Sequence, residues 1–201
     1  ACFDSHRAST RALSRCSITI EEADRPNIET FAESLLSSFR VYGDSEVLDI
    51  WSFVIRNCYK PRMLEGRFNG IASNPPWLSM SKLSRNPYTE ALNQRAELFG
   101  IKPPGMAFLH LELATVFLLT ACKRYAKPNC KILCIVPTTV LNGYHQEPFR
   151  REQYRSADSP VPFKVEGIWT LPDNTFKNKA IVLSGVRSEL PAEYPLQGTA
   201  I

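Results

Sequence analysis

Apolar and polar residues alternate along the chain in a way that predicts strands and helices in turn. Short apolar runs bounded by turn residues predict strands, and stretches with apolar residues on one helical face predict helices. Strand, helix, strand, helix and two late strands together predict half of an α/β sheet. The expected strands are residues 17–20, 68–73, 131–136, 163–171 and 180–186, and the expected helices are residues 28–40, 45–60, 105–125 and 148–155.

Some of these elements carry a more specific expectation. Residues 105–125 form the longest predicted helix, and its broad apolar surface indicates that it is mostly buried. Residues 131–136 are continuously apolar, which is typical of a central parallel strand. Pro61 is expected to end the second helix. Residues 78–104 are polar and irregular, and we expect a loop or a small helical excursion there, longer than the usual connection of about 4 to 6 residues.

Composition is that of an ordinary soluble globular protein, with 44% hydrophobic and 22% charged residues in a chain of 201. A formal charge of +4 permits an anionic partner without requiring one. No stretch approaches the roughly 18 to 20 apolar residues of a membrane span, and the N-terminus has no signal-peptide pattern. The six cysteines lack metal-ligand spacing, so we expect no metal site. Free, buried thiols and a reducing, cytoplasmic setting are favoured, with Cys122, Cys130 and Cys134 in apolar surroundings.

The segment with the most specific chemistry is Asn74-Pro75-Pro76-Trp77, which follows the predicted strand 68–73. Ligands of open α/β sheets bind outside the carboxyl ends of strands. Two prolines stiffen the turn and remove two backbone donors. The Asn74 carboxamide oxygen and the Pro75 carbonyl can then accept both hydrogens of an aromatic amine, while Trp77 offers a surface for stacking an extruded base. A rigid surface turn with a packed tryptophan is the plainer alternative.

This tetrapeptide and its surroundings resemble the adenine-N6 DNA methyltransferases of the large restriction–modification and phage-defence type. The resemblance spans roughly residues 45–187 and includes residues 51–61, 110–114, 135–143 and Phe149-Arg150. It implies a partial Rossmann-like sheet with flanking helices, mostly parallel with a late antiparallel strand. It also implies S-adenosylmethionine as methyl donor and a flipped adenine in double-stranded DNA as acceptor. Asn74 and Pro75 would hold the amino group, Pro76 would shape the turn, and Trp77 would stack on the base.

The chain departs from this family in one respect. The family's glycine-rich donor-binding turn should precede the Asn-Pro-Pro segment, but the first 73 residues contain only Gly43, Gly66 and Gly70. We therefore expect a C-terminal part of a longer enzyme, a split subunit or a degenerate remnant, and the residues that bind the donor stay unknown. On this view residues 1–26 are an N-terminal arm or truncated edge, residues 27–187 a partial catalytic domain, and residues 188–201 a tail.

A basic cluster between residues 123 and 155 provides candidates for DNA phosphate contacts. This stretch contains seven basic residues and only two acidic ones. A phosphate-facing patch and a solvated face are equally compatible with that excess. The candidate DNA-binding residues are Lys123, Arg124, Arg150, Arg151 and Arg155.

Four further polar residues, Thr138, Thr139, Asn142 and His145, follow the predicted strand 131–136 and could line the target pocket or be ordinary loop residues. We expect packing or capping roles for His110 and Glu112 on the long helix. Two other functions stay open: methylation of a protein glutamine amide, which poses a similar geometric problem to an aromatic amine, and a non-catalytic DNA-binding or assembly module.

Overall fold

The computed structural model describes residues 26, 30, 34, 53, 54, 57–83 and 87–200, the last four of them by their backbone only. The chain divides into two compact units, Ala1–Met63 and Leu64–Ile201. The predicted strand at 17–20 and most of the predicted helix at 28–40 lie outside the described residues. In the first unit residues 57–63 are helical. The expected end of this helix at Pro61 is wrong, because a proline removes one backbone donor but keeps a helical φ, and the last turn continues.

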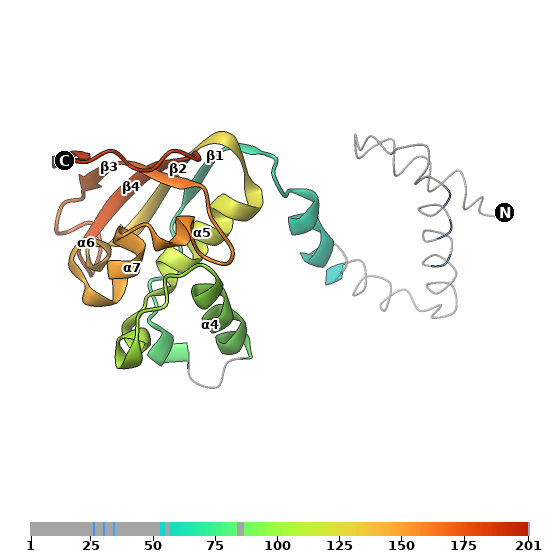
Figure 1. Cartoon of the computed structure of the whole chain (residues 1–201), viewed down its shortest axis with the longest axis horizontal. Coiled ribbons are helices and arrows are strands. Elements are labelled where there is room, and N and C mark those ends of the chain that lie inside the picture. Colours follow the sequence, from blue (N-terminus) through green and yellow to red (C-terminus); the bar gives the residue numbers. More distant parts are fainter. Residues whose placement is uncertain are drawn as a thin grey trace. The chain divides into compact units, whose positions relative to one another are not determined.

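The second unit is built on a five-stranded sheet with the order β1-β2-β4-β3-β5 (Figure 1). Its strands are β1 (Phe68–Ser73), β2 (Ala126–Pro137), β3 (Phe163–Thr170), β4 (Ala180–Arg187) and β5 (Gln197–Ala200). The pairs β1–β2 and β3–β5 are parallel, whereas β4 is antiparallel to both β2 and β3. Four strands therefore run in one direction and β4 alone runs in the other. The predicted fold class, an α/β sheet that is mostly parallel with a late antiparallel strand, is confirmed.

The helical segments of this unit are mostly short. They are η1 (Met80–Leu83), α4 (Tyr88–Leu98), η2 (Gly105–His110), α5 (Leu113–Tyr125), α6 (Thr139–Asn142), η3 (Tyr144–Gln146), α7 (Glu147–Arg150) and η4 (Gln153–Arg155). The helical excursion expected within 78–104 is confirmed by η1 and α4. The domain boundaries predicted at residues 26 and 187 stay predictions.

The predicted continuous helix over 105–125 is wrong. It is divided at Leu111 and Glu112, which have extended backbones with ψ of 124° and 142°. Tertiary hydrogen bonds hold this break: the Leu113 N–H donates to the Leu78 carbonyl at 2.9 Å, and the Leu111 carbonyl accepts from Met80 N–H at 2.9 Å. Helical periodicity continues through the break, so only the pairing with residues 78–80 reveals it.

The predicted basic helix over 148–155 is also wrong as one element, because α7 and η4 are separate. Glu152 between them has a left-handed backbone with φ of 54°. Its carboxylate accepts from the Ala192 backbone N–H at 3.3 Å. A contact with a segment forty residues away therefore accompanies the change of direction, and helix propensity does not decide it.

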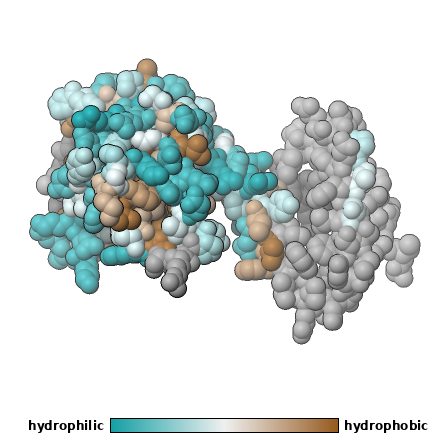
Figure 2. Space-filling view, turned by 60° about the horizontal axis from the view of Figure 1, so that its bottom comes forward, coloured by the Kyte–Doolittle hydropathy of each residue, from teal (hydrophilic) through white to brown (hydrophobic). Residues whose placement is uncertain are grey.

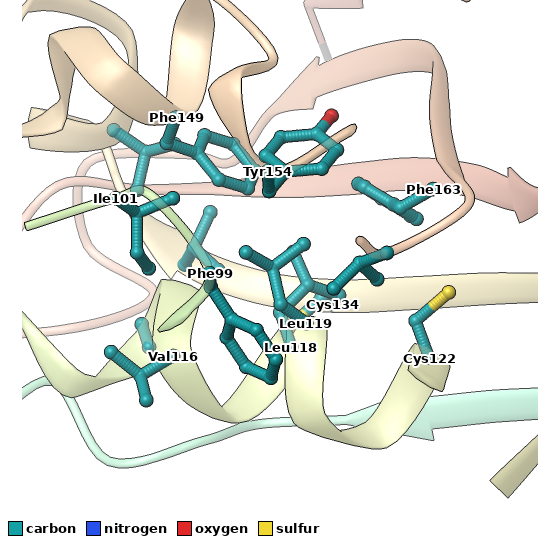
Figure 3. Close-up of a cluster of buried hydrophobic side chains, with 14 of the residues drawn as sticks. Phe99, Ile101, Val116, Leu118, Leu119, Cys122, Cys134, Phe149, Tyr154 and Phe163 are labelled. Carbon is teal, nitrogen blue, oxygen red and sulfur yellow. The ribbon is translucent and has the colours of Figure 1, made fainter. Parts of the chain in front are cut away.

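The core lies between α5 and the sheet and continues under the segment that carries α7 and η4. Figure 3 shows α5 side chains, including Leu118 and Leu119, facing Cys134 of β2 and the rings of Phe149 and Tyr154. The described cysteines are free, and Cys122, Cys130 and Cys134 are buried, as expected. Burial raises the pKa of the Cys134 thiol to about 12. Among the described residues, no helix has the length and apolarity needed to cross a membrane.

Candidate functional site

Asn74-Pro75-Pro76-Trp77 leaves the carboxyl end of β1, as the strand prediction requires. The last register pair between β1 and β2 is Ser73 with Cys134, so the turn begins directly beyond it. Pro75 is buried, Trp77 is half-buried, and Asn74 and Pro76 are exposed. The turn is therefore anchored at its second and fourth residues and presents the first and third to solvent.

Asn74 keeps its hydrogen-bonding groups available. Within the described part of the chain, neither the Asn74 carboxamide nor the Pro75 carbonyl oxygen takes part in a hydrogen bond. Pro75 and Pro76 carry no backbone N–H that could compete for a ligand's acceptors. These are the two acceptors that the sequence assigns to an amino group, and their predicted role stays a prediction.

Trp77 has a structural role that the sequence did not specify. Its indole N–H donates to the Ile135 carbonyl of β2 at 3.1 Å, one residue beyond the last β1–β2 pair. Its ring meets Phe176 edge-on, with centroids 5.2 Å apart and planes at 62°. The side chain thus fixes the turn against β2 and against the loop after β3. Stacking on a base, the predicted role, would use the surface that these contacts leave exposed.

The residues that follow β2 pack on Glu112 at the same edge of the sheet. Thr139 Oγ1 donates to Glu112 Oε2 at 2.5 Å, and Gln146 Nε2 donates to the same oxygen at 3.4 Å. His145 Nε2 lies 3.7 Å from it. Glu112 precedes α5 and forms an isolated antiparallel bridge with Ser79, so it does not lie on a continuous long helix as expected.

This polar cluster braces the start of α5 against the loop that carries α6 and η3. His110 is exposed, and its ring centroid lies 6.4 Å from that of His145. Thr138 is half-buried and Asn142 is exposed. The described residues contain no group of three His, Cys, Asp or Glu side chains that could hold a metal ion.

The five candidate DNA-binding residues do not share one surface role. Arg150 Nη1 donates to the carbonyls of Gly143 at 2.7 Å and Val140 at 3.2 Å. Arg155 Nη1 donates to the Phe163 carbonyl at 2.7 Å, and its Nε lies 3.8 Å from Glu152. Both guanidinium groups therefore hold loops of this chain together.

The other three candidates are more accessible. Arg151 is exposed and pairs with Glu147 at 2.6 Å. Arg124 pairs with Glu65 at 2.6 Å, and Lys123 Nζ donates to Ser159 Oγ at 2.5 Å. Lys123 and Arg124 line a hollow near the amino ends of β1 and β2, whereas Asn74 lies at the carboxyl end of β1. DNA binding by these residues stays a prediction.

The described residues do not fit a cradle for S-adenosylmethionine of the kind that the family resemblance implies. Such a cradle needs a glycine turn directly after a strand, where the backbone can approach the ligand closely. The five strands are followed instead by Asn74, Thr138, Leu171, Ser188 and residue 201. Gly143, which lies near this edge, is occupied by packing: a Cβ there would stand 2.8 Å from the His145 ring.

No family model matches the chain. A search of curated proteins likewise finds no match. Among solved structures, one similar fold is a Listeria monocytogenes protein described as a "putative class I s-adenosylmethionine-dependent methyltransferase", with 14% identity and a TM-score of 0.46. The match covers 66% of this chain but only 36% of that one, so the chain spans about a third of its length.

Sequence reasoning missed two features of the site. Phe176, which packs on Trp77, belongs to the loop after β3. Ligands bind outside the carboxyl ends of strands, and this holds for the loop after β3 as it does for Asn74 after β1. Glu112 was assigned to a helix face, although it connects Thr139 and Gln146. Only its bridge with Ser79 reveals this position, and no local sequence signal marks that bridge.

Proposed function

We propose that this chain supplies the amino-group acceptor site of an S-adenosylmethionine-dependent adenine-N6 DNA methyltransferase. The observation that supports the proposal is the anchored turn: Pro75 and Trp77 are fixed by packing, while the neighbouring Asn74 carboxamide is exposed and unbonded within the described residues. A preorganised pair of acceptors costs little reorganisation when it binds a ligand.

The chemistry at this turn follows from the hydrogen-bonding capacity of an aromatic amine. The Asn74 Oδ1 and the Pro75 carbonyl oxygen accept the two N–H hydrogens of adenine N6. Two bonds of this kind draw the nitrogen lone pair out of conjugation with the ring and make the nitrogen nucleophilic. The methyl group would pass directly from the donor's sulfur to N6, with the sulfur–methyl bond breaking as the nitrogen–methyl bond forms, the thioether product leaving and one N6 proton passing to solvent, so no covalent enzyme intermediate is needed. The methyl donor is held by residues outside the described part of the chain or by a partner polypeptide.

A second candidate, methylation of a protein glutamine amide, is favoured by one specific observation. Arg150 and Arg155 bond to carbonyls of this chain, which weakens the case for a broad phosphate-binding surface. A primary amide offers the same two N–H hydrogens as an aromatic amine, so the Asn74–Pro75 pair serves either acceptor.

The absence of a donor cradle among the described residues favours a third candidate, a module that binds the target without catalysis. Equilibrium dialysis of the full chain against S-adenosylmethionine separates this candidate from the first two. Salt-sensitive duplex binding without donor binding would support the third candidate and contradict methyl transfer by the isolated chain.

The deciding experiment compares Asn74→Ala with wild type and with Asn69→Ala. Asn69 is an exposed asparagine on β1, five residues before the turn, and serves as the matched control. The full chain, alone and with the polypeptide that supplies the donor site, is given S-adenosylmethionine with a labelled methyl group and mixed genomic duplex DNA. Mass spectrometry of the released nucleosides then measures N6-methyladenine.

We expect Asn74→Ala to lower methyl transfer about a hundredfold, because one of two preorganised acceptors is lost, while Asn69→Ala retains wild-type transfer. Donor binding should be unchanged in both variants. Transfer by Asn74→Ala at the wild-type rate would contradict the acceptor role. In a parallel reaction with a release-factor-type protein in place of DNA, label incorporated into that protein but not into DNA would favour the glutamine candidate.

A further inference from the structure

A second site lies near the amino ends of β1 and β2, at the opposite end of β1 from the Asn-Pro-Pro-Trp turn. It is a hollow of about 460 Å³, within the size range of small-molecule sites. We call it the basic hollow. Its lining residues come from α4, α5 and two connecting segments: Glu65, Arg95, Leu98, Phe99, Thr120, Lys123, Arg124 and Ser159.

The two helices each present one face to the basic hollow. Arg95 and Leu98 on α4, and Thr120 and Lys123 on α5, are spaced by three residues, which places each pair on one helical face. α4 and α5 are both ordered around the hydrophobic core, and Phe99, at the end of α4, is 5% exposed. Apolar and cationic groups therefore line the same hollow.

Backbone hydrogen bonds hold the rim of the basic hollow in place. The Ser159 N–H donates to the Leu98 carbonyl at 2.9 Å, which ties one connecting segment to α4. The Gly66 N–H donates to the Arg124 carbonyl at 2.9 Å, which ties the segment before β1 to α5. The hollow is thus largely preformed, as ligand sites usually are.

Positive charge is in excess in this hollow. Arg124 is neutralised by Glu65 at 2.6 Å. Among the described residues, Lys123 has only the neutral Ser159 hydroxyl as a hydrogen-bond partner, and the Arg95 guanidinium has none. The C-termini of α4 and α5 contribute roughly half a negative charge each, which offsets part of this excess but provides no discrete counter-ion.

We propose that the basic hollow binds a small phosphorylated organic molecule, with Arg95 and Lys123 on the phosphate and Leu98 and Phe99 against its apolar part. A guanidinium and an ammonium are the usual partners of a phosphate in proteins. A nucleic acid backbone fits less well, because the Arg150 and Arg155 guanidinium groups are bound to carbonyls of this chain. Figure 2 shows apolar side chains gathered between hydrophilic ones on the face that it presents.

This site is separate from the proposed acceptor site. Glu65 lies before the start of β1 and pairs with Arg124 at the end of α5, whereas Asn74 lies after the end of β1. The six residues of β1 span roughly 20 Å. Binding at the basic hollow can therefore be measured without methyl transfer, and Asn74→Ala should leave it unchanged.

The test uses phenyl phosphate as probe, with inorganic phosphate and phenol as the two halves of its chemistry. Titration calorimetry or NMR shifts on the full chain measure each affinity. We expect phenyl phosphate to bind about tenfold more tightly than either half, since charge and apolar contacts both contribute. Equal affinity for phenyl phosphate and inorganic phosphate would overturn the proposal.

Four variants locate the probe. Arg95→Gln and Lys123→Gln should each weaken phenyl phosphate binding about tenfold, because each removes a charged hydrogen bond. Glu65→Gln removes the carboxylate that neutralises Arg124 and should tighten phenyl phosphate binding. A purely structural role of Glu65 would not predict tighter binding. Lys179→Gln is the control, since Lys179 is exposed and pairs with Asp173 outside the hollow.

A competition arm distinguishes the two sources of phosphate. A short DNA duplex should not displace phenyl phosphate. Displacement by the duplex, with the same loss of duplex binding in Arg95→Gln, would assign the hollow to nucleic acid and overturn the proposal. Unchanged binding in both Arg95→Gln and Lys123→Gln, with circular dichroism confirming their fold, would also overturn it.

Discussion

Trp77→Phe tests how the candidate turn is held in place. The substitution keeps an aromatic ring next to Phe176 but removes the indole N–H that donates to the Ile135 carbonyl at 3.1 Å. The Ile135 carbonyl lies one residue beyond the last β1–β2 pair. Pro75 and Pro76, which follow β1, have no backbone N–H that could donate to this carbonyl in place of the indole. The free energy of unfolding should therefore fall by the value of one hydrogen bond.

The expected magnitude is about 1 kcal/mol for a neutral hydrogen bond whose acceptor stays partly buried. For a unit of this size, that corresponds to a fall of roughly 3 to 5 °C in Tm. The substitution itself removes a fluorophore, so unfolding followed by tryptophan fluorescence would give different signals for the two proteins. Thermal unfolding followed by circular dichroism is therefore the better assay.

Trp169→Phe is the matched control. Trp169 of β3 is half-buried like Trp77, but its indole N–H has no hydrogen-bond partner within the described residues. The two variants lose similar ring area, so their difference isolates the hydrogen bond. Equal free energies of unfolding for Trp77→Phe and Trp169→Phe would refute the claim that this bond anchors the turn.

Two further predictions concern the core. Burial raises the pKa of the Cys122 thiol to about 12, above its ordinary range. The unfolded state therefore loses this proton first, and the free energy of unfolding should fall as pH rises from about 9 toward 12. In native protein at pH 8, iodoacetamide should modify the exposed Cys58 and spare Cys122, and equal labelling of the two would contradict this burial. Gly185→Ala should cost about 3 kcal/mol or more in urea unfolding, because its Cβ would stand 2.5 Å from the Lys164 carbonyl oxygen. Gly70→Ala, whose nearest atom would be 4.0 Å away, should be tolerated, and similar losses in the two variants would contradict the steric argument.

Local pattern was sufficient to predict most strands of the sheet. Residues 68–73, 163–170 and 180–187 form strands close to the expected bounds, and β2 extends the expected 131–136 to Ala126–Pro137. Continuous β-branched and apolar runs bounded by prolines and polar turns have few other stable conformations. The position of Asn74 at a strand's carboxyl end followed from the same local information.

Long-range contacts decided the rest. The break at Leu111–Glu112 depends on hydrogen bonds to residues 78–80, and the left-handed Glu152 contacts Ala192. Neither partner lies within the window over which helical periodicity is read. Arg150 and Arg155 looked like phosphate ligands in the sequence, because a charge count contains no information on which carbonyls a guanidinium can reach.

The sequence by itself determined four of the five strands, the α/β class and the stiff Asn-Pro-Pro turn, because these depend on local sterics and on the period of apolar residues. Only the tertiary structure decided that Trp77 holds this turn to β2, that Glu112 leaves the helix, and that Arg95 and Lys123 come together at one hollow. The physical reason is the same in each case: the groups that meet are far apart along the chain, and the sheet and its covering helices set the distances between them.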